Sequence, residues 1–181
     1  MEGLSIRDMT MRDVRQVSTV RITGWKAAYV GMVPQEYLDG LSVEADMEQR
    51  RKLFGRDARV HDVVAEHGGA VVGWAVLGPC RDEWGTGRDG EIYALYVAPE
   101  LIGRGVGRGL VRELVSRARR ANQEFLHVWV IEENHRARRF YERAGFTPDG
   151  ERELWDVGGA SVPELRYVRA LSEAGQRARR D

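Results

Sequence analysis

The chain is poor in several features that mark specialised proteins. Its 181 residues include one cysteine, Cys80, so no disulfide can form within the chain, and a reducing compartment is natural. Lys and Arg number 28, as do Asp and Glu, so the formal net charge is zero and gives no general argument for binding nucleic acid or an acidic membrane. No apolar run approaches the roughly 20 residues that span a bilayer. Residues 1–4 show no signal-peptide pattern, and we expect a cytoplasmic protein with no membrane or nucleic-acid partner.

The length and the spacing of apolar residues predict one α/β domain over residues 1–171, followed by a polar tail at 172–181. Apolar residues recur at helical spacing over 11–30, 43–54, 106–120 and 134–144. Short strand-like runs occupy 4–9, 60–66, 70–77, 91–97, 125–131, 152–156 and 165–171. We therefore expect a mixed sheet with helices on both faces.

A glycine-rich turn joins one of these strands to a helix. The strand pattern ends at Pro99, glycines follow at 103, 105 and 107, and an amphipathic helix begins at about Val106. The first N–H groups of a helix lack partners within it and lie at the positive end of its dipole, so such a turn can bind an anion, above all a phosphate. The alternative is a turn that only caps the helix.

Two common phosphate-binding motifs do not fit this turn. The dinucleotide motif GxGxxG requires glycine at 108 or 110, where the chain has Arg108 and Leu110. The P-loop requires Gly-Lys followed by Ser or Thr, and the chain has no such sequence.

The turn resembles the acyl-CoA pyrophosphate loop of the GNAT superfamily of N-acetyltransferases, [Q/R]-x-x-G-x-[G/A] after a strand and a proline. Residues 91–99 (EIYALYVAP) resemble the strand, and Gly105 and Gly107 the glycine pair. Ile102 departs from the pattern, which usually has Arg or Gln there. The register Arg104-x-x-Gly107-x-Gly109 fits literally, but it would move the loop two residues into the helix, so we prefer the first.

A second segment, residues 134–146, resembles the other signature of this family, N-x-x-A-x-x-x-Y-x-x-x-G-F. On a helix, Asn134, Ala137 and Tyr141 share one face. Asn134 suits a helix N-cap, although its amide can instead reach a ligand. Gly145 suits the left-handed position after a helix. The alternative for Tyr141 is a core aromatic.

The resemblance implies the GNAT fold, a mixed and mostly antiparallel sheet of about seven strands, flanked by helices and splayed between the fourth and fifth strands. Acetyl-CoA would lie in this gap as acyl donor. The binding residues implied are Leu95, Tyr96, Val97, Gly103, Arg104, Gly105, Val106, Gly107, Arg108 and Asn134.

The resemblance further implies acetyl transfer to a primary amine of a small molecule or peptide by direct attack. Tyr141 occupies the position of the general acid, and Glu91 that of the general base in some members. A solvent-exposed strand-end residue is the alternative for Glu91, and His127 is an alternative proton relay, although a lone core histidine is more often structural. Trp25 and Tyr29 would wall the acceptor pocket.

Trp84 and the loop 79–90 would close over the substrate. We expect no metal. A non-catalytic acyl-CoA-binding module is the alternative function, and a homodimer is common in the family. Neither motif identifies the acceptor.

Overall fold

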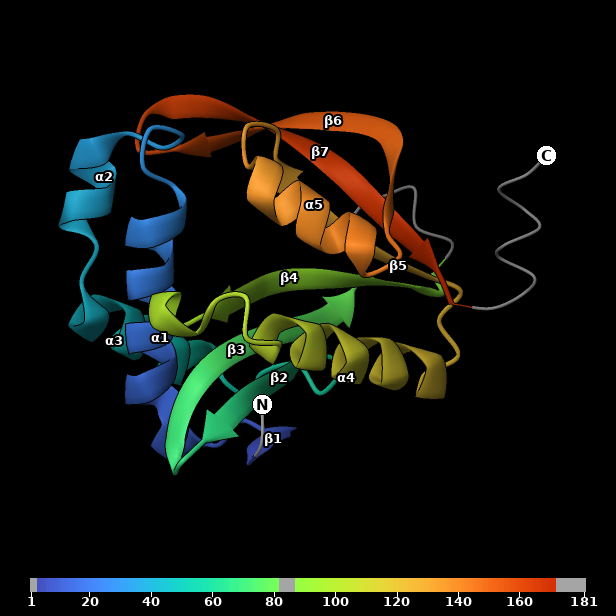
Figure 1. Ribbon diagram of the computed structural model, residues 1–181, viewed down its shortest axis with the longest axis horizontal. Coiled ribbons are helices and arrows are strands. Elements are labelled where there is room, and N and C mark those ends of the chain that lie inside the picture. Colours follow the sequence, from blue (N-terminus) through green and yellow to red (C-terminus); the bar gives the residue numbers. More distant parts are fainter. Residues whose placement is uncertain (1–2, 82–86, 172–181) are drawn as a thin grey trace.

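The computed structural model describes residues 3–81 and 87–171, so the predicted roles of Trp84 and of the tail 172–181 lie outside it. Within the described residues one sheet has the strand order β1-β2-β3-β4-β5-β7-β6, in which only β4 and β5 are parallel neighbours (Figure 1). The strands are β1 (Leu4–Asp8), β2 (His61–His67), β3 (Ala70–Pro79), β4 (Asp89–Val97), β5 (Phe125–Ile131), β6 (Thr147–Val157) and β7 (Ala160–Ala170). The predicted mixed, mostly antiparallel sheet is confirmed.

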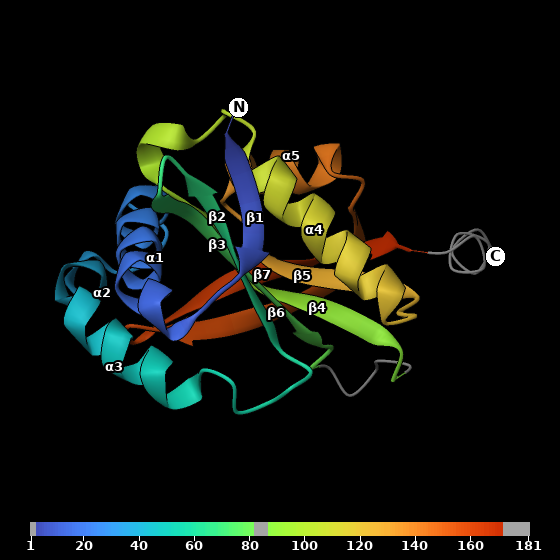
Figure 2. The same cartoon turned by 90° about the horizontal axis from the view of Figure 1, so that it is seen from below.

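Helices cover both faces of the sheet, as predicted. One face carries α1 (Val14–Ala28), α2 (Gln35–Gly40) and α3 (Val43–Leu53). The other carries α4 (Val106–Arg120) and α5 (His135–Arg143), as the view from below shows (Figure 2). No helix in the described ranges is long and apolar enough to cross a membrane.

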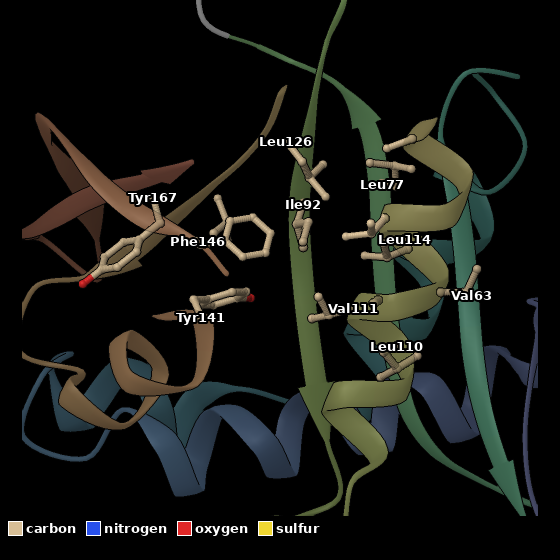
Figure 3. Packing of buried hydrophobic residues seen from close by; sticks show 14 of the residues in the cluster. Val63, Leu77, Ile92, Leu110, Val111, Leu114, Leu126, Tyr141, Phe146 and Tyr167 are labelled. Atoms are coloured by element: carbon tan, nitrogen blue, oxygen red, sulfur yellow. The ribbon is translucent and has the colours of Figure 1, made fainter. Parts of the chain in front are cut away.

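The largest hydrophobic core lies between the sheet and the helices α4 and α5 (Figure 3). The apolar stripe of α4 includes Leu110 and Leu114, both fully buried, because their spacing of four places them on one face of the helix. A second core packs α1 and α3 on β2 and β3, and a third joins α1 and α2 to β6 and β7. The sheet is thus covered on both faces.

The parallel pairing of β4 with β5 is short. It runs from Asp89↔Phe125 to Glu91↔His127 and then ends, so the two strands separate. This confirms the predicted splay. The N–H of Ala98 donates to Val72 O, so Ala98 is hydrogen-bonded toward β3. In an antiparallel pair, every second residue is hydrogen-bonded to the neighbouring strand. The backbone groups of Leu95 and Val97 therefore face the gap instead of β3.

A β-bulge interrupts β4 at Tyr93. Val76 pairs with Ala94 and Leu77 with Ile92, which leaves Tyr93 as the extra residue. Ile92 belongs to the core under α4, whereas Tyr93 packs on the α1 side. Side chains alternate between the faces of a strand, so Glu91 lies on the α1 side as well.

Three elements, β6, β7 and α2, differ clearly from the sequence prediction. The strands β6 and β7 are longer than the predicted 152–156 and 165–171, because a register shift between Pro148 and Arg152 lets β6 continue past a proline and a glycine. The helix α2 was not predicted, since six residues show too little periodicity.

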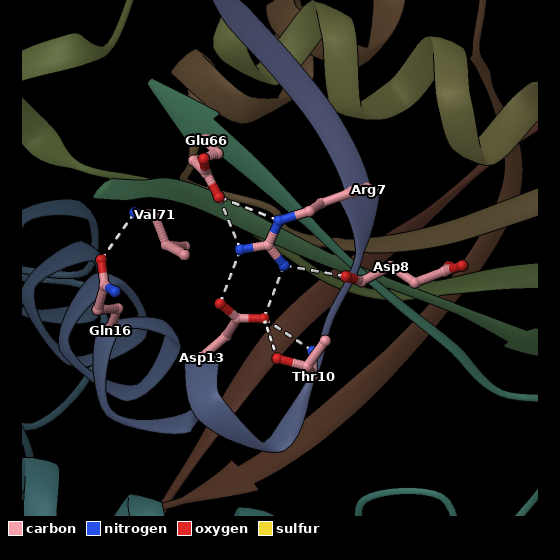
Figure 4. Close-up of polar contacts among 7 residues, drawn as sticks. All are labelled: Arg7, Asp8, Thr10, Asp13, Gln16, Glu66 and Val71. Carbon is pink, nitrogen blue, oxygen red and sulfur yellow. Dashed lines mark hydrogen bonds and ion pairs between the residues drawn. The ribbon is translucent and has the colours of Figure 1, made fainter. Parts of the chain in front are cut away.

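A polar network ties the first strand to the first helix (Figure 4). Arg7 of β1 donates two hydrogen bonds to Asp13, of 2.7 and 2.8 Å, and two to Glu66 of β2, of 2.7 and 3.0 Å. The bonds from Arg7 hold the pKa of Asp13 at about 2, below its ordinary value. Asp13 also accepts from Thr10, so the network fixes where α1 starts.

Candidate active site

A cavity of about 1080 Å³ follows the gap between β4 and β5 and opens on both faces of the sheet. We call the part on the α4 and α5 face the glycine side and the part on the α1 face the aromatic side. The predicted site residues that line it are Trp25, Tyr29, Glu91, Leu95, Tyr96, Val97, Gly103, Gly105, Gly107, Arg108, Asn134 and Tyr141. Arg104 and Val106 do not line it.

The glycine turn has the conformation that its composition implies. Gly103 and Gly105 have φ of 84° and 93°, in the left-handed region that other residues avoid. Arg104 is the one residue of the turn whose N–H is used internally, since it donates to Leu101 O. Five N–H groups have no hydrogen bond to another described residue, those of Gly103, Gly105, Val106, Gly107 and Arg108. They form a cradle of donors at the N-terminus of α4.

Arginines add positive charge to the glycine side. Arg108 of α4 and Arg136, Arg139 and Arg143 of α5 all line it. The helix that carries the last three begins at a cap, because Asn134 Oδ1 accepts from the Ala137 N–H at 3.0 Å. This confirms the predicted cap. Contact of the Asn134 amide with a ligand stays a prediction.

Tyr141 lies where the gap meets the glycine side. Its ring is edge-on to Phe140 at 5.0 Å and to Phe146 at 5.5 Å, and only 7% of the residue is exposed. Its hydroxyl points toward β4 (Figure 3). Burial raises the pKa of Tyr141 well above 10, so the hydroxyl keeps its proton near neutral pH and can donate it. Gly145 after α5 has φ of 84°, as predicted.

Aromatic rings surround the aromatic side. Trp25 contacts Tyr29, Trp155 and Tyr96, with ring centroids 5.1, 5.5 and 6.5 Å apart. The hydroxyls of Tyr29 and Tyr96 are 3.3 Å apart. Trp25 and Tyr29 therefore line this cavity, as predicted for an acceptor pocket, and also pack against the third core.

The sequence model of the Acetyltransferase (GNAT) family matches residues 28–146. The chain belongs to the GNAT family of acetyltransferases. It is 30% identical over 131 residues to the uncharacterized N-acetyltransferase YuaI of Bacillus subtilis, which covers 72% of this chain and 73% of the relative.

Two solved structures show the same fold. PaiA N-acetyltransferase from Thermoplasma acidophilum, in complex with coenzyme A, has a TM-score of 0.68 at 18% identity and covers 92% of this chain and 98% of its own. A chimera of the spermidine N-acetyltransferase SpeG from Vibrio cholerae and hSSAT has a TM-score of 0.70 at 21% identity and covers 95% and 98%. The chain is thus a GNAT acetyltransferase, and the likeness to these structures shows the fold alone.

In this GNAT acetyltransferase Glu91 is buried, with 1% exposed, so the alternative of a solvent-exposed strand-end residue is wrong. Its carboxylate accepts from Arg81 at both oxygens. The Arg81 backbone N–H and Nε each donate at 3.0 Å, and Nη2 donates as well. Glu91 lines the cavity as predicted, yet a proton from a substrate would have to compete with the Arg81 guanidinium.

Sequence reasoning missed two acidic residues of this GNAT site, Glu153 of β6 and Glu164 of β7. They are cross-strand partners in the ladder. Burial raises the pKa of Glu164 to about 7, and repulsion from Glu153 adds to the effect. The register of β6 on β7 brings the two together. The Gly158-Gly159 turn that joins these strands is the sequence signal that could have found this pairing.

The structure gives no support to His127 as a proton relay of this acetyltransferase. His127 Nε2 lies 3.7 Å from Asp89 Oδ2, and the histidine does not line the cavity. The described residues contain no group of three or more His, Cys, Asp or Glu side chains placed to hold a metal ion.

Proposed function

We propose that the protein is an N-acetyltransferase that moves the acetyl group of acetyl-CoA to a primary amine of a small molecule or peptide. The observation that carries the proposal is the cradle of five unpartnered N–H groups, four of which belong to residues that line the cavity containing Tyr141. An unpartnered donor is costly unless water or a ligand satisfies it, and a diphosphate satisfies several at once.

The residues present fit the parts of the donor. The N–H groups of the glycine turn would hold the diphosphate, and Arg108 would add a charge-assisted contact. The backbone groups of Leu95 and Val97, which face the gap, would bind the amide-bearing arm between β4 and β5. Ile102 offers no polar group, so binding at the turn would depend on the backbone.

Acetyl-CoA supplies an activated acetyl thioester when bound. The Tyr141 hydroxyl would donate a proton to the departing sulfur, since its raised pKa keeps it protonated. Backbone N–H groups of β4 in the gap would stabilise negative charge on the acetyl oxygen. A carboxylate on the aromatic side would remove a proton from the amine, and Glu91 is the one that the family resemblance indicates.

Thermal unfolding with and without acetyl-CoA tests donor binding. A ligand at 100 times its Kd stabilises a protein by about 2.7 kcal/mol, so a clear rise in Tm is expected. No rise at saturating acetyl-CoA would contradict the donor assignment. A second assay follows the release of free thiol with a panel of primary amines. A rise in Tm without thiol release would leave the non-catalytic acyl-CoA-binding module as the function.

A further inference from the structure

We propose that Glu164 is the group that accepts the proton of the acceptor, and that the acceptor is a primary alkylammonium ion on an apolar body, with no carboxylate beside its nitrogen. This inference rests on the proposed acetyl transfer and names its substrate class and its base. It is carried by three features of the aromatic side: a carboxylate available for a ligand, an excess of acidic side chains, and aromatic walls.

Glu164 is the available carboxylate. It lies on β7 between Ile131 of β5 and Glu153 of β6, and it lines the cavity. Its carboxylate has no hydrogen bond or ion pair with any residue in the described ranges, although the residue is largely buried. Glu91, in contrast, accepts three hydrogen bonds from Arg81. Glu164 can therefore take a proton without breaking an existing bond.

The surroundings of Glu164 suit proton transfer near neutral pH. A general base works best when its pKa is close to the working pH, and burial raises the pKa of Glu164 to about 7. Glu153 and Glu91 raise it further and Arg81 opposes them. Five charged or titratable groups act on Glu164 or respond to its charge. They are Glu153 of β6, Arg81 just after β3, Glu91 and Tyr96 of β4, and Tyr29 at the end of α1.

Glu164 and Tyr141 belong to one site. The buried hydroxyl pair of Tyr29 and Tyr96 lies near both of them. Burial, foremost, raises the pKa of Tyr29, and Tyr96, Tyr141 and Glu164 all add to the rise. An amine beside this pair would have a proton acceptor at Glu164 and, at Tyr141, a donor for the leaving group.

The charge balance of the aromatic side selects a cation. Glu91, Glu153 and Glu164 line it, and the two arginines there are already engaged. Arg81 binds Glu91, and Arg21 binds Asp46 at 2.7 Å. A carboxylate next to the reacting nitrogen would be repelled by the ionised Glu164, whereas an ammonium ion would be attracted to it. Trp25 and Trp155 offer aromatic surface for its apolar body, and Arg21 already lies over the Trp25 ring at 4.8 Å.

The acetyl transfer removes two protons from the acceptor nitrogen. The Glu164 carboxylate takes one proton from the ammonium nitrogen, whose lone pair then forms the C–N bond to the acetyl carbon. The C–S bond breaks, its electron pair stays on sulfur, and Tyr141 gives sulfur a proton. The second proton lost by nitrogen replaces the one that Tyr141 gave, and Glu164 releases its proton to water.

The first experiment compares pH–rate profiles of the wild type, Glu164→Gln and Glu91→Gln, with the exposed Glu151→Gln as matched control. The activity of the wild type should rise with pH along a limb near pH 7, because Glu164 must be ionised to accept a proton. Glu164→Gln should lose that limb and about 100-fold in kcat, with acetyl-CoA affinity unchanged. Glu91→Gln should keep the limb but move it to lower pH. Arg81, released from Glu91, would then stabilise the ionised form of Glu164. Glu151→Gln should match the wild type.

The second experiment tests the acceptor with matched pairs, 2-phenylethylamine against phenylalanine and pentylamine against 2-aminohexanoic acid. Within each pair the amine should have at least about a tenfold higher kcat/KM, which corresponds to 1.4 kcal/mol. Equal values, or a preference for the amino acids, would overturn the substrate class.

A third readout needs no turnover. Glu164 has a higher pKa in the folded protein than in the unfolded chain, so its ionisation lowers stability as pH rises from about 4.5 through 7. Glu164→Gln should therefore have a higher Tm than the wild type near pH 8, and the difference should shrink near pH 5.

The outcomes separate the two proposals. A limb that persists in Glu164→Gln, or a kcat within about twofold of the wild type, would overturn the role of Glu164 while acetyl transfer stands. A wild type that acetylates no amine of the panel would contradict the proposed function and this inference with it.

Discussion

The two sides of the cavity are built in different ways. The donor cradle of the glycine side is made by one continuous segment, in which the backbone N–H groups of Gly103 and of residues 105–108 form the binding surface. The aromatic side is made by side chains from α1, β4, β6 and β7, which are far apart in the sequence. A surface made of backbone depends on conformation, whereas one made of side chains depends on residue identity. The donor side should therefore be sensitive to conformation and the acceptor side to chemistry.

The largest effect is expected at Tyr141, which we propose acts on the sulfur of the donor while the acceptor amine attacks, and so serves both the glycine side and the aromatic side. Tyr141→Phe removes the proton donor and leaves the ring contacts with Phe140 and Phe146 in place. We expect kcat to fall about 100-fold, while the acetyl-CoA Kd changes little. Steady-state kinetics and calorimetric titration measure the two effects. An unchanged kcat would remove Tyr141 as the acid.

A change of conformation should break the glycine side. Gly105→Val places a branched residue at φ of 93°, which costs about 1–3 kcal/mol of strain and disturbs the N–H cradle. We expect the acetyl-CoA Kd to rise about tenfold or more. Gly159→Val is the matched control, because Gly159 has φ of 80° in the turn between β6 and β7. It should lower Tm without changing the Kd, and an equal Kd change in both variants would contradict the assignment.

A change of chemistry should weaken the aromatic side alone. Trp25→Phe keeps an aromatic ring but reduces the aromatic surface offered to the acceptor amine. We expect the KM of the acceptor amine to rise about threefold to fivefold, since such contacts contribute about 0.5–1 kcal/mol. The acetyl-CoA Kd should stay the same. If the acetyl-CoA Kd changes and the acceptor KM does not, the assignment of the two sides is reversed.

A smaller effect, in stability alone, should come from the network at Arg7, away from both sides. Asp13→Asn should lower the free energy of unfolding by about 1–2 kcal/mol near pH 7. The folded pKa of Asp13 is depressed to about 2, so its contribution is present above about pH 4 and is lost as pH falls toward 2. Urea unfolding at several pH values measures the difference. Neither the acetyl-CoA Kd nor the acceptor KM should change.

The same contrast explains what the sequence could predict. Gly145 was assigned correctly to the left-handed position, because a positive φ and a glycine go together locally. Gly103 and Gly105 also have a positive φ, which was not predicted for them. The cap at Asn134 and the whole of α4 were also predicted, since their signals lie within one segment. The gap between β4 and β5 followed from the family resemblance.

The aromatic side could be predicted only in part. Glu91 was found through its place in a motif, but its pairing with Arg81 was not, because the partner comes from another segment. Glu164 was missed altogether. Its raised pKa arises from burial beside Glu153, and that requires the register of two strands whose extent was underestimated. The local signal of that register was the Gly158-Gly159 turn between the two strands.

The extra residue at Tyr93 interrupts the alternation of side chains in β4, and so it decides which face of the sheet the residues before it point to. Without it, Glu91 would lie under α4 among apolar side chains, and Ile92 would take its place among the carboxylates. A single-residue insertion or deletion between 91 and 95 would thus exchange a charge for a hydrocarbon on both faces of the sheet at once. The glycine turn that follows would keep its sequence unchanged. A homologue with such a change would keep the donor turn, while its acceptor side would carry different side chains and the spacing of the strand motif at residues 91–99 would be altered.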